Sequence, residues 1–152
     1  MTLPVQLSEH LSLAEFSTDS PTARQHGIDN TLPEELLDEA LRTAQMFERV
    51  RAELGSNAVH VDSGYRCLAL NRELGSKDTS DHPKAMALDI KCPGFGSAYQ
   101  VAKHLESIMD ELGIGQLIYE NTWVHISSRA PEKAINKVLT VRPGMYVVGI
   151  QL

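Results

Sequence analysis

Two histidines and one aspartate occupy positions that suit a metal ion. His82 and Asp89 lie seven residues apart at the entrance to a short apolar run, and His125 comes much later, directly after Trp123-Val124. Two imidazoles and one carboxylate can hold a zinc ion and leave its fourth position open for water. Such a water has its pKa lowered to about 7, which makes it a nucleophile at neutral pH. These residue types therefore indicate metal-assisted hydrolysis.

The same spacing also fits a purely structural arrangement. A histidine and an aspartate on one polar face often form a hydrogen-bonded pair without a metal. From spacing alone both interpretations stay open. The elements that carry the three residues decide whether their side chains can meet.

Alternating residues place two of the three on strands. Residues 85–91 alternate in polarity, which predicts a strand with Asp89 on the face opposite the apolar one. Residues 115–119 and 123–126 predict a tight hairpin, with His125 on its polar face. If these strands are neighbours, their polar faces form one continuous surface that carries both Asp89 and His125.

The third residue comes from a polar loop. Residues 76–84 lack apolar periodicity and carry His82 directly before Pro83. Because a residue that precedes proline disfavours the helical region, we expect His82 to be extended.

The rest of the chain predicts an α+β fold. Apolar residues at three- and four-residue steps predict helices over 32–54 and 98–112, and a shorter helix covers 68–74. Alternation predicts further strands over 58–63, 138–141 and 145–150, while 128–137 is irregular, with one helical turn expected after Pro131. The order predicts a small, mainly antiparallel sheet flanked by helices. We expect one domain over 1–152, with residues 1–30 packed on it as an arm through Leu11, Leu13 and Phe16.

Composition narrows the classes of protein. The 152 residues carry a net charge of −6, which argues against a nucleic-acid partner. There is no secretory signal and no apolar run near 18 residues, so we expect cytoplasmic synthesis and no membrane span. Cys67 and Cys92 are too few for a disulfide framework, and free thiols are favoured over one bridge.

Three segments resemble one peptidase family. Ser80-x-His82-x-x-Ala85-x-Ala87-x-Asp89 is similar to the Ser-x-His-x-x-Gly-x-Ala-x-Asp signature of the zinc D-alanyl-D-alanine carboxypeptidase family (VanY-like), which includes bacteriophage peptidoglycan endopeptidases (endolysins). Trp123-Val124-His125 resembles its Trp-x-His ligand segment. Ser63-Gly64-Tyr65-Arg66, followed by Asn71, resembles its upstream segment. The likeness runs in order over roughly residues 10–127.

The resemblance implies a complete site. It implies a hedgehog/D-Ala-D-Ala-peptidase-like zinc site with one Zn²⁺ per chain, held by His82, Asp89 and His125. It implies substrate binding by Arg66 and Ser80. The implied activity is that of a zinc metallopeptidase, a carboxypeptidase or endopeptidase, acting on peptides of peptidoglycan.

The chain departs from the family pattern at two positions. Ala85 replaces the signature glycine, at a cost of roughly 1 kcal/mol if the position needs a positive φ. Thr122 stands where many relatives carry an acidic residue, three positions before the last histidine. We expect Glu120 to act as the general base instead, with Asp62 and Asp81 as alternatives.

Two functions follow as expectations. The first is a monomeric endolysin-type enzyme that degrades the bacterial cell wall, acting in the periplasm after release or as part of a bacteriophage particle. The alternative is a non-catalytic metal-binding or phage structural module of the same fold, because fold does not settle function. An acid beside the metal favours the enzyme, and its absence favours the module.

Overall fold

The computed structural model describes residues 2–131 and 137–152. The helical turn expected after Pro131 lies outside the described residues. Cys67 and Cys92 are free thiols, as expected. Within the described ranges, no helix combines the length and the apolar character needed to span a membrane.

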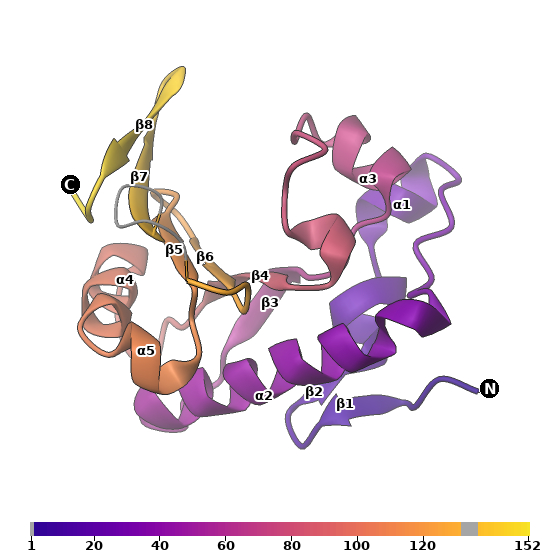
Figure 1. Ribbon diagram of the computed structural model, residues 1–152, viewed down its shortest axis with the longest axis horizontal. Helices are drawn as coiled ribbons and strands as arrows, with labels where there is room; N and C mark the ends of the chain where they lie inside the picture. Colours follow the sequence, from indigo (N-terminus) through magenta and orange to yellow (C-terminus); the bar gives the residue numbers. More distant parts are fainter. Residues whose placement is uncertain (1, 132–136) are drawn as a thin grey trace.

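A six-stranded sheet forms the centre of the fold (Figure 1). Its strands follow the order β3 (His60–Ser63), β4 (Ala87–Lys91), β6 (Val124–Ser127), β5 (Gln116–Tyr119), β7 (Val138–Arg142), β8 (Met145–Val148). Every neighbouring pair is antiparallel except β5 and β7, which run parallel. The predicted α+β fold with a mainly antiparallel sheet is therefore confirmed.

The helices match the apolar stripes, with shorter bounds. The first predicted helix begins with a 3-10 turn, η2 (Glu34–Leu36), and continues as α2 (Leu37–Glu53). The short third helix is α3 (Leu68–Glu73). The last predicted helix is divided into α4 (Ala98–Glu106) and α5 (Met109–Leu112). Between them the Ser107 hydroxyl donates to the His104 carbonyl at 2.8 Å, and such a bond competes with the helical backbone ladder.

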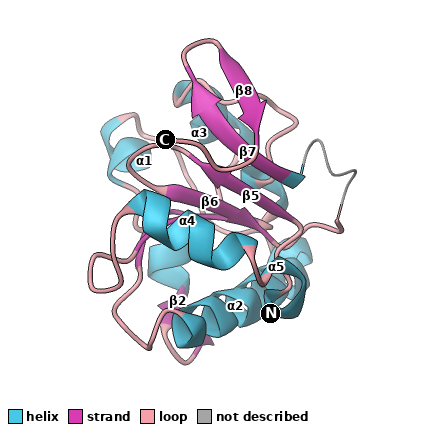
Figure 2. Ribbon diagram, turned by 90° about the vertical axis from the view of Figure 1, so that its left-hand side faces the viewer, coloured by secondary structure: helices cyan, strands magenta, loops and turns pink. Residues whose placement is uncertain are grey.

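The core lies on one side of the sheet. Helix α4 packs on β5 and β6, and α2 passes below the same strands (Figure 2). Leu88 and Ile90 of β4 point into this layer and are fully buried, together with Phe47 of α2 and Leu105 of α4. Each such side chain contributes about 1.5–3 kcal/mol when it leaves water. Burial of the apolar face of β4 therefore fixes Asp89 on the opposite face.

The N-terminal segment packs against the strand end that precedes Arg66. It contains β1 (Gln6–Ser8), β2 (Leu11–Ser12), the π-helical turn η1 (Ala14–Thr18) and α1 (Pro21–Gln25). Leu11 and Phe16 are buried, and Leu13 is partly buried, as expected. A Cβ atom at Gly64 would lie 2.5 Å from the Phe16 carbonyl oxygen, so only glycine permits this contact.

Candidate metal centre

His82 belongs to a tight turn, so the expected extended conformation is wrong. It opens the 3-10 turn η3 (His82–Lys84). The Lys84 amide donates to the Asp81 carbonyl at 3.1 Å, and the Ala85 amide donates to the His82 carbonyl at 3.2 Å. Pro83 sits where the turn needs no N–H donor. These bonds outweigh the local bias of the residue before proline.

The turn closes at Ala85, where the family signature has glycine. Ala85 has a φ of 60°, in the left-handed region. Glycine suits this position because it adopts such a φ without a steric penalty. Its carbonyl accepts a hydrogen bond of 2.7 Å from Thr43 Oγ1, and Thr43 is fully buried on α2. Helix α2 thereby holds the point at which the turn passes into β4.

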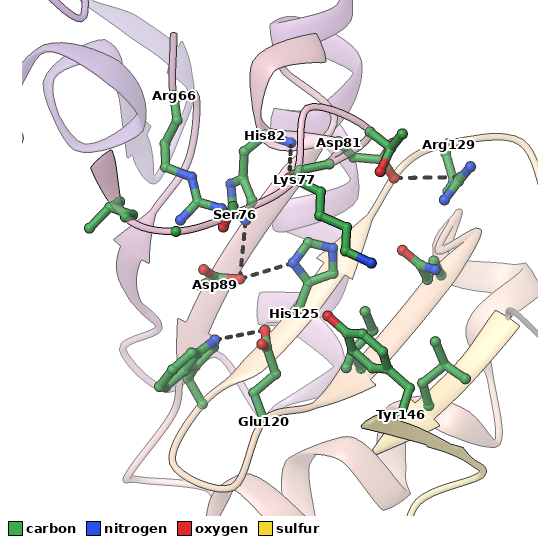
Figure 3. Close-up of a pocket in the computed structure, with 18 residues that line it drawn as sticks. Arg66, Ser76, Lys77, Asp81, His82, Asp89, Glu120, His125, Arg129 and Tyr146 are labelled. Atoms are coloured by element: carbon green, nitrogen blue, oxygen red, sulfur yellow. Dashed lines mark hydrogen bonds and ion pairs between the residues drawn. The ribbon is translucent and has the colours of Figure 1, made fainter. Parts of the chain in front are cut away.

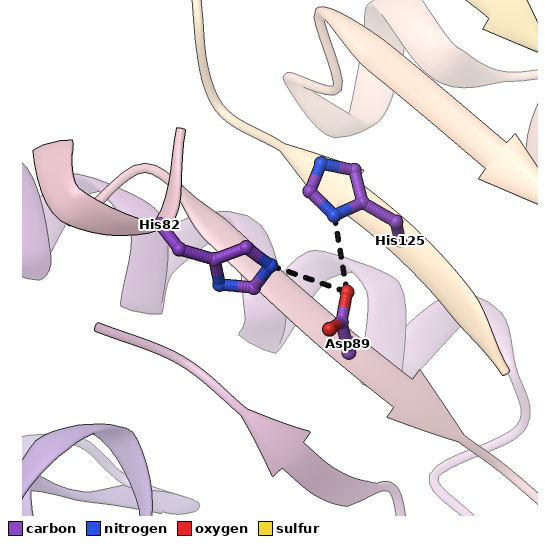
Figure 4. Close-up of side chains that lie close together, drawn as sticks. All are labelled: His82, Asp89 and His125. Atoms are coloured by element: carbon purple, nitrogen blue, oxygen red, sulfur yellow. Dashed lines mark hydrogen bonds and ion pairs between the residues drawn. The ribbon is translucent and has the colours of Figure 1, made fainter. Parts of the chain in front are cut away.

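The other two candidate ligands face each other across two strands. Asp89 of β4 and His125 of β6 are direct partners in the antiparallel register, so their side chains share a face. His125 Nδ1 lies 3.0 Å from Asp89 Oδ1, and His82 Nε2 lies 3.4 Å from the same oxygen. One ligand atom from each residue lies within 4.8 Å of the others, and all three residues are buried (Figure 4).

The tautomer of His82 follows from its outer contact. His82 Nδ1 lies 2.6 Å from the Gly64 carbonyl oxygen, which can only accept, so Nδ1 carries the proton. Burial lowers the pKa of His82 and keeps the ring neutral. The lone pair of Nε2 therefore points at the Asp89 carboxylate, an arrangement that a cation between them stabilises. A carbonyl behind a ligating histidine is the usual outer partner in metal sites.

Asp89 and His125 form a charged, hydrogen-bonded pair, and His125 must release its proton when it binds a metal. Burial opposes ionisation of Asp89, but the hydrogen bond and charge of the His125 imidazole outweigh it and hold the pKa of Asp89 well below the ordinary range. Burial also opposes the charged form of His125, yet Asp89 raises the pKa of that imidazole. Two imidazole nitrogens and one carboxylate oxygen form a donor set that zinc accepts, with a position left open. The residues present therefore fit a zinc ion.

One cavity of about 670 Å³ lies over this group. Its lining includes the expected metal ligands His82, Asp89 and His125, the expected substrate-binding residues Arg66 and Ser80, and the expected general base Glu120 (Figure 3). Residues from four separate parts of the chain thus meet in one hollow.

Glu120 lies at the edge of this cavity, held by the hairpin turn. Asn121 adopts a φ of 67°, and the Glu120 amide donates to the Trp123 carbonyl at 3.0 Å. The Trp123 indole N–H donates to Glu120 Oε2 at 2.9 Å, which fixes the carboxylate (Figure 3). Burial raises the pKa of Glu120, and the negative charge of Asp89 raises it further.

The two alternative acids are placed differently. Asp62 pairs with Lys91 at 3.4 Å on the exposed side of β3 and is not part of the cavity lining. Asp81 does line the cavity, but its Oδ2 accepts the Ser127 hydroxyl at 2.7 Å and lies 3.5 Å from Arg129 Nε. Glu120 is therefore the cavity acid that best suits proton transfer.

Arg66 lines the cavity, and its guanidinium group makes fewer hydrogen bonds than it could. Its Nη2 lies 3.4 Å from the Ser76 hydroxyl, and its buried Nε has no hydrogen-bond partner in the described part of the chain. Burial lowers the pKa of the Arg66 guanidinium, while Asp89 and Glu120 act in the opposite direction. Ser80 accepts the His82 amide at 3.2 Å with its hydroxyl oxygen, so it also braces the turn.

Sequence patterns gave no signal for several residues that shape the site. Asn30 is buried and donates to the carbonyls of Ser17 (2.7 Å) and Tyr65 (2.9 Å), while its Oδ1 accepts the Cys67 amide at 2.8 Å. These bonds hold the backbone on both sides of Arg66. A lone asparagine in an irregular segment is more often a turn residue, so only the structure reveals this role.

The cavity lining also includes Lys77, Arg129 and Tyr146. Lys77 belongs to the segment between α3 and η3, and its carbonyl accepts Asn71 Nδ2 at 2.9 Å. The fully buried Asn71 thus fixes the backbone of Lys77, from which the Lys77 side chain extends. Tyr146 comes from β8, far from the other motifs in sequence.

Comparison with known proteins identifies the family. A family model described as peptidase M15 matches residues 9–127. A search of curated protein sequences gives no match. The matched segment contains all three candidate ligands and ends at the last residue of β6. It covers well over half of the chain, so this chain belongs to the peptidase M15 family, which includes the zinc D-alanyl-D-alanine carboxypeptidases.

Proposed function

We propose that this chain is a zinc-dependent peptidoglycan peptidase that hydrolyses an amide bond in bacterial cell-wall peptides, as an endolysin-type lysis enzyme. The observation that carries the proposal is the convergence of His82, Asp89 and His125 in one cavity that also contains Glu120. Membership of the peptidase M15 family supports peptide-bond hydrolysis. In this proposal the enzyme reaches the wall after release from the cell that makes it, or as part of a virion.

His82, Asp89 and His125 hold the zinc ion in this proposal. Zinc bound there supplies Lewis acidity, which lowers the pKa of a water in the open position and polarises a carbonyl oxygen. The Gly64 carbonyl keeps the Nδ1 proton of His82 in place, so Nε2 remains a ligand atom.

Glu120 moves the proton. Its carboxylate accepts a proton from the attacking water, whose oxygen bonds to the substrate carbonyl carbon. The same carboxyl group then donates that proton to the amide nitrogen as the carbon–nitrogen bond breaks, which yields a carboxylic acid and an amine. The acid then ionises, and the amine takes up its proton. A raised pKa suits both tasks, because a general acid–base works best near the operating pH.

Arg66 and Ser80 bind the substrate. The buried guanidinium of Arg66 has an unpartnered Nε, so a substrate oxygen in the cavity would complete its hydrogen bonds. Binding of that oxygen orients the scissile amide over the metal ligands, and orientation is a large part of rate enhancement.

Digestion of purified peptidoglycan tests the proposal. Mass spectrometry of the products should show new amine termini with the wild type and none with His82→Ala, and the new termini identify the bond. Glu120→Gln should keep about one zinc per chain and lose about 10²–10⁴-fold in turnover. Asp62→Asn is the matched control, because Asp62 pairs with Lys91 outside the cavity, and it should match the wild type.

Equal products from the wild type and His82→Ala would contradict the zinc mechanism. Near wild-type turnover of Glu120→Gln would remove Glu120 from proton transfer and leave the zinc site intact. Zinc binding without any cleavage of peptidoglycan would favour a non-catalytic module instead.

A further inference from the structure

The hairpin of β7 and β8 lies beyond the segment that matches the family. The match ends at residue 127, whereas β7 and β8 cover Val138–Arg142 and Met145–Val148. This hairpin nevertheless supplies Leu139 and Tyr146 to the wall of the cavity. Part of the cavity is therefore built by residues that the family pattern does not include.

The hairpin is tied to the turn that carries Glu120. Strand β7 pairs with β5 in parallel, and the register ends at the pair Tyr119 and Thr140. One residue further, Asn121 Nδ2 donates to the Val141 carbonyl at 3.3 Å. Val141 is the direct cross-strand partner of Tyr146. The position of Tyr146 is thus set relative to the residue that follows Glu120.

Tyr146 points back from the hairpin toward Glu120 and His125 (Figure 3). Its side chain lies on a cavity wall, yet 57% of the residue is exposed. Its hydroxyl has no hydrogen-bond partner among the residues that the structure describes. Burial raises the pKa of the Tyr146 phenol, and the charge of Glu120 adds to this, so the group stays protonated and can donate.

We propose that Tyr146 is a substrate-contacting residue, whose hydroxyl donates a hydrogen bond to a backbone carbonyl of the peptide that lies beside Glu120. The inference rests on the proposed function and extends it to a residue outside the family segment. The nearby carboxylate of Glu120 disfavours an anionic group at this point, whereas a neutral peptide carbonyl accepts from the phenol without that repulsion. The ring itself gives the bound peptide an apolar surface, as tyrosine does in many binding sites.

Steady-state kinetics with the peptide that the wild type cleaves provide the test. Tyr146→Phe removes only the hydroxyl and should raise KM about 2- to 10-fold, with kcat and zinc content unchanged, as expected for one neutral hydrogen bond. Tyr146→Ala also removes the ring and should raise KM further. Met145→Ala is the control, because Met145 is exposed on the same strand and is not part of the cavity lining.

A binding measurement separates contact from turnover. In the Glu120→Gln background, calorimetry with the same peptide should give a Kd that rises by the same factor when Tyr146→Phe is added. An unchanged Kd and KM in Tyr146→Phe would overturn the inference, even if the wild type is active. A wild type that cleaves no peptidoglycan peptide would instead contradict the proposed function, so the two failures are distinguishable.

Discussion

The methyl group of Ala85 occupies a backbone position that favours glycine. Its φ of 60° costs an alanine about 1 kcal/mol or slightly more, because Cβ approaches the backbone in the left-handed region. The same methyl is fully buried in the core, where it gains about 0.8 kcal/mol. The two terms nearly cancel, which explains why alanine is tolerated at this point of the signature.

Two substitutions at this position test that balance. Ala85→Gly should change the free energy of unfolding by less than about 1 kcal/mol, because relief of strain is offset by the lost methyl and a freer unfolded chain. Ala85→Val should destabilise by about 3 kcal/mol, since a β-branched residue is strained at positive φ and overfills the core. Urea denaturation of both variants measures the difference. A stable valine variant would contradict the proposed strain.

Single-residue roles were only partly predictable from the sequence. Alternation within residues 85–91 was enough to place Asp89 on the polar face, because strand side chains have a period of two. The turn at His82 was not predictable, since it depends on bonds from Ser80 and Asp81 that outweigh the proline bias. Asn30 gave no signal, because all partners of its side chain are backbone groups of other segments.

At the scale of elements, one carboxylate ties the β1–β2 hairpin to α2. Glu48 Oε2 accepts the Ser8 hydroxyl at 2.6 Å and the His10 amide at 2.8 Å, and Oε1 lies 2.7 Å from His10 Nδ1. Burial acts to raise the pKa of Glu48, but these hydrogen bonds outweigh it and lower the pKa. A lowered pKa in the folded state means that the ionised group stabilises the fold.

Glu48→Gln should therefore destabilise the protein by about 1 kcal/mol at neutral pH. The contribution of Glu48 is complete above the ordinary glutamate pKa of about 4.3 and is lost as the pH falls through the lower folded value. Thermal unfolding from pH 3 to pH 7 should show the two proteins converging at the acid end.

Glu53→Gln is the matched control for this series. Glu53 lies on the same helix and also contacts a histidine, His104 at 3.0 Å, but both side chains are over a third exposed. Exposed pairs contribute little, so this variant should follow the wild type at every pH. A difference between Glu48→Gln and the wild type that persists at pH 3 would contradict the role of ionised Glu48.

Element type was easier to predict than element arrangement. Periodicity marked both long helices and the strands near their observed bounds, because packing on one face repeats along the chain. The parallel pairing of β5 with β7 has no local signal, since β6 lies between these two strands in the sequence. The Ser107 bond that divides the last helix is equally invisible to an apolar stripe.

On the scale of the whole molecule, the candidate zinc site joins three segments. Its ligands come from η3, β4 and β6, and His125 is 36 residues from Asp89. A metal bound there stabilises only the folded chain, by about 2.7 kcal/mol when free zinc is a hundred times its Kd. For a chain of this length that corresponds to a rise of roughly 5–10 °C in Tm.

Calorimetry with and without a chelator checks this expectation. The wild type should lose the increment in Tm when zinc is removed and regain it on addition of zinc. His82→Ala should show a much smaller response, because the remaining two ligands leave the site incomplete. A wild-type Tm that does not respond to zinc would contradict metal binding by these residues.

The sequence predicted only part of the cavity wall. The signature residues and their alternation predicted the floor of the cavity, because the polar faces of β4 and β6 can be recognised from their sequences. Its far wall comes from β8, whose register relative to Glu120 depends on long-range pairing through β7. The place of Tyr146 in the cavity wall therefore could not be predicted from the sequence.

The direct opposition of Asp89 and His125 has a consequence for how the chain folds. A slip of β6 by one residue along β4 would turn His125 to the apolar side and present Val124 or Ile126 to the carboxylate. A metal that requires both side chains on one face would bind only the native alignment. Zinc binding during folding would thus stabilise the native register of β4 and β6 over registers shifted by one residue.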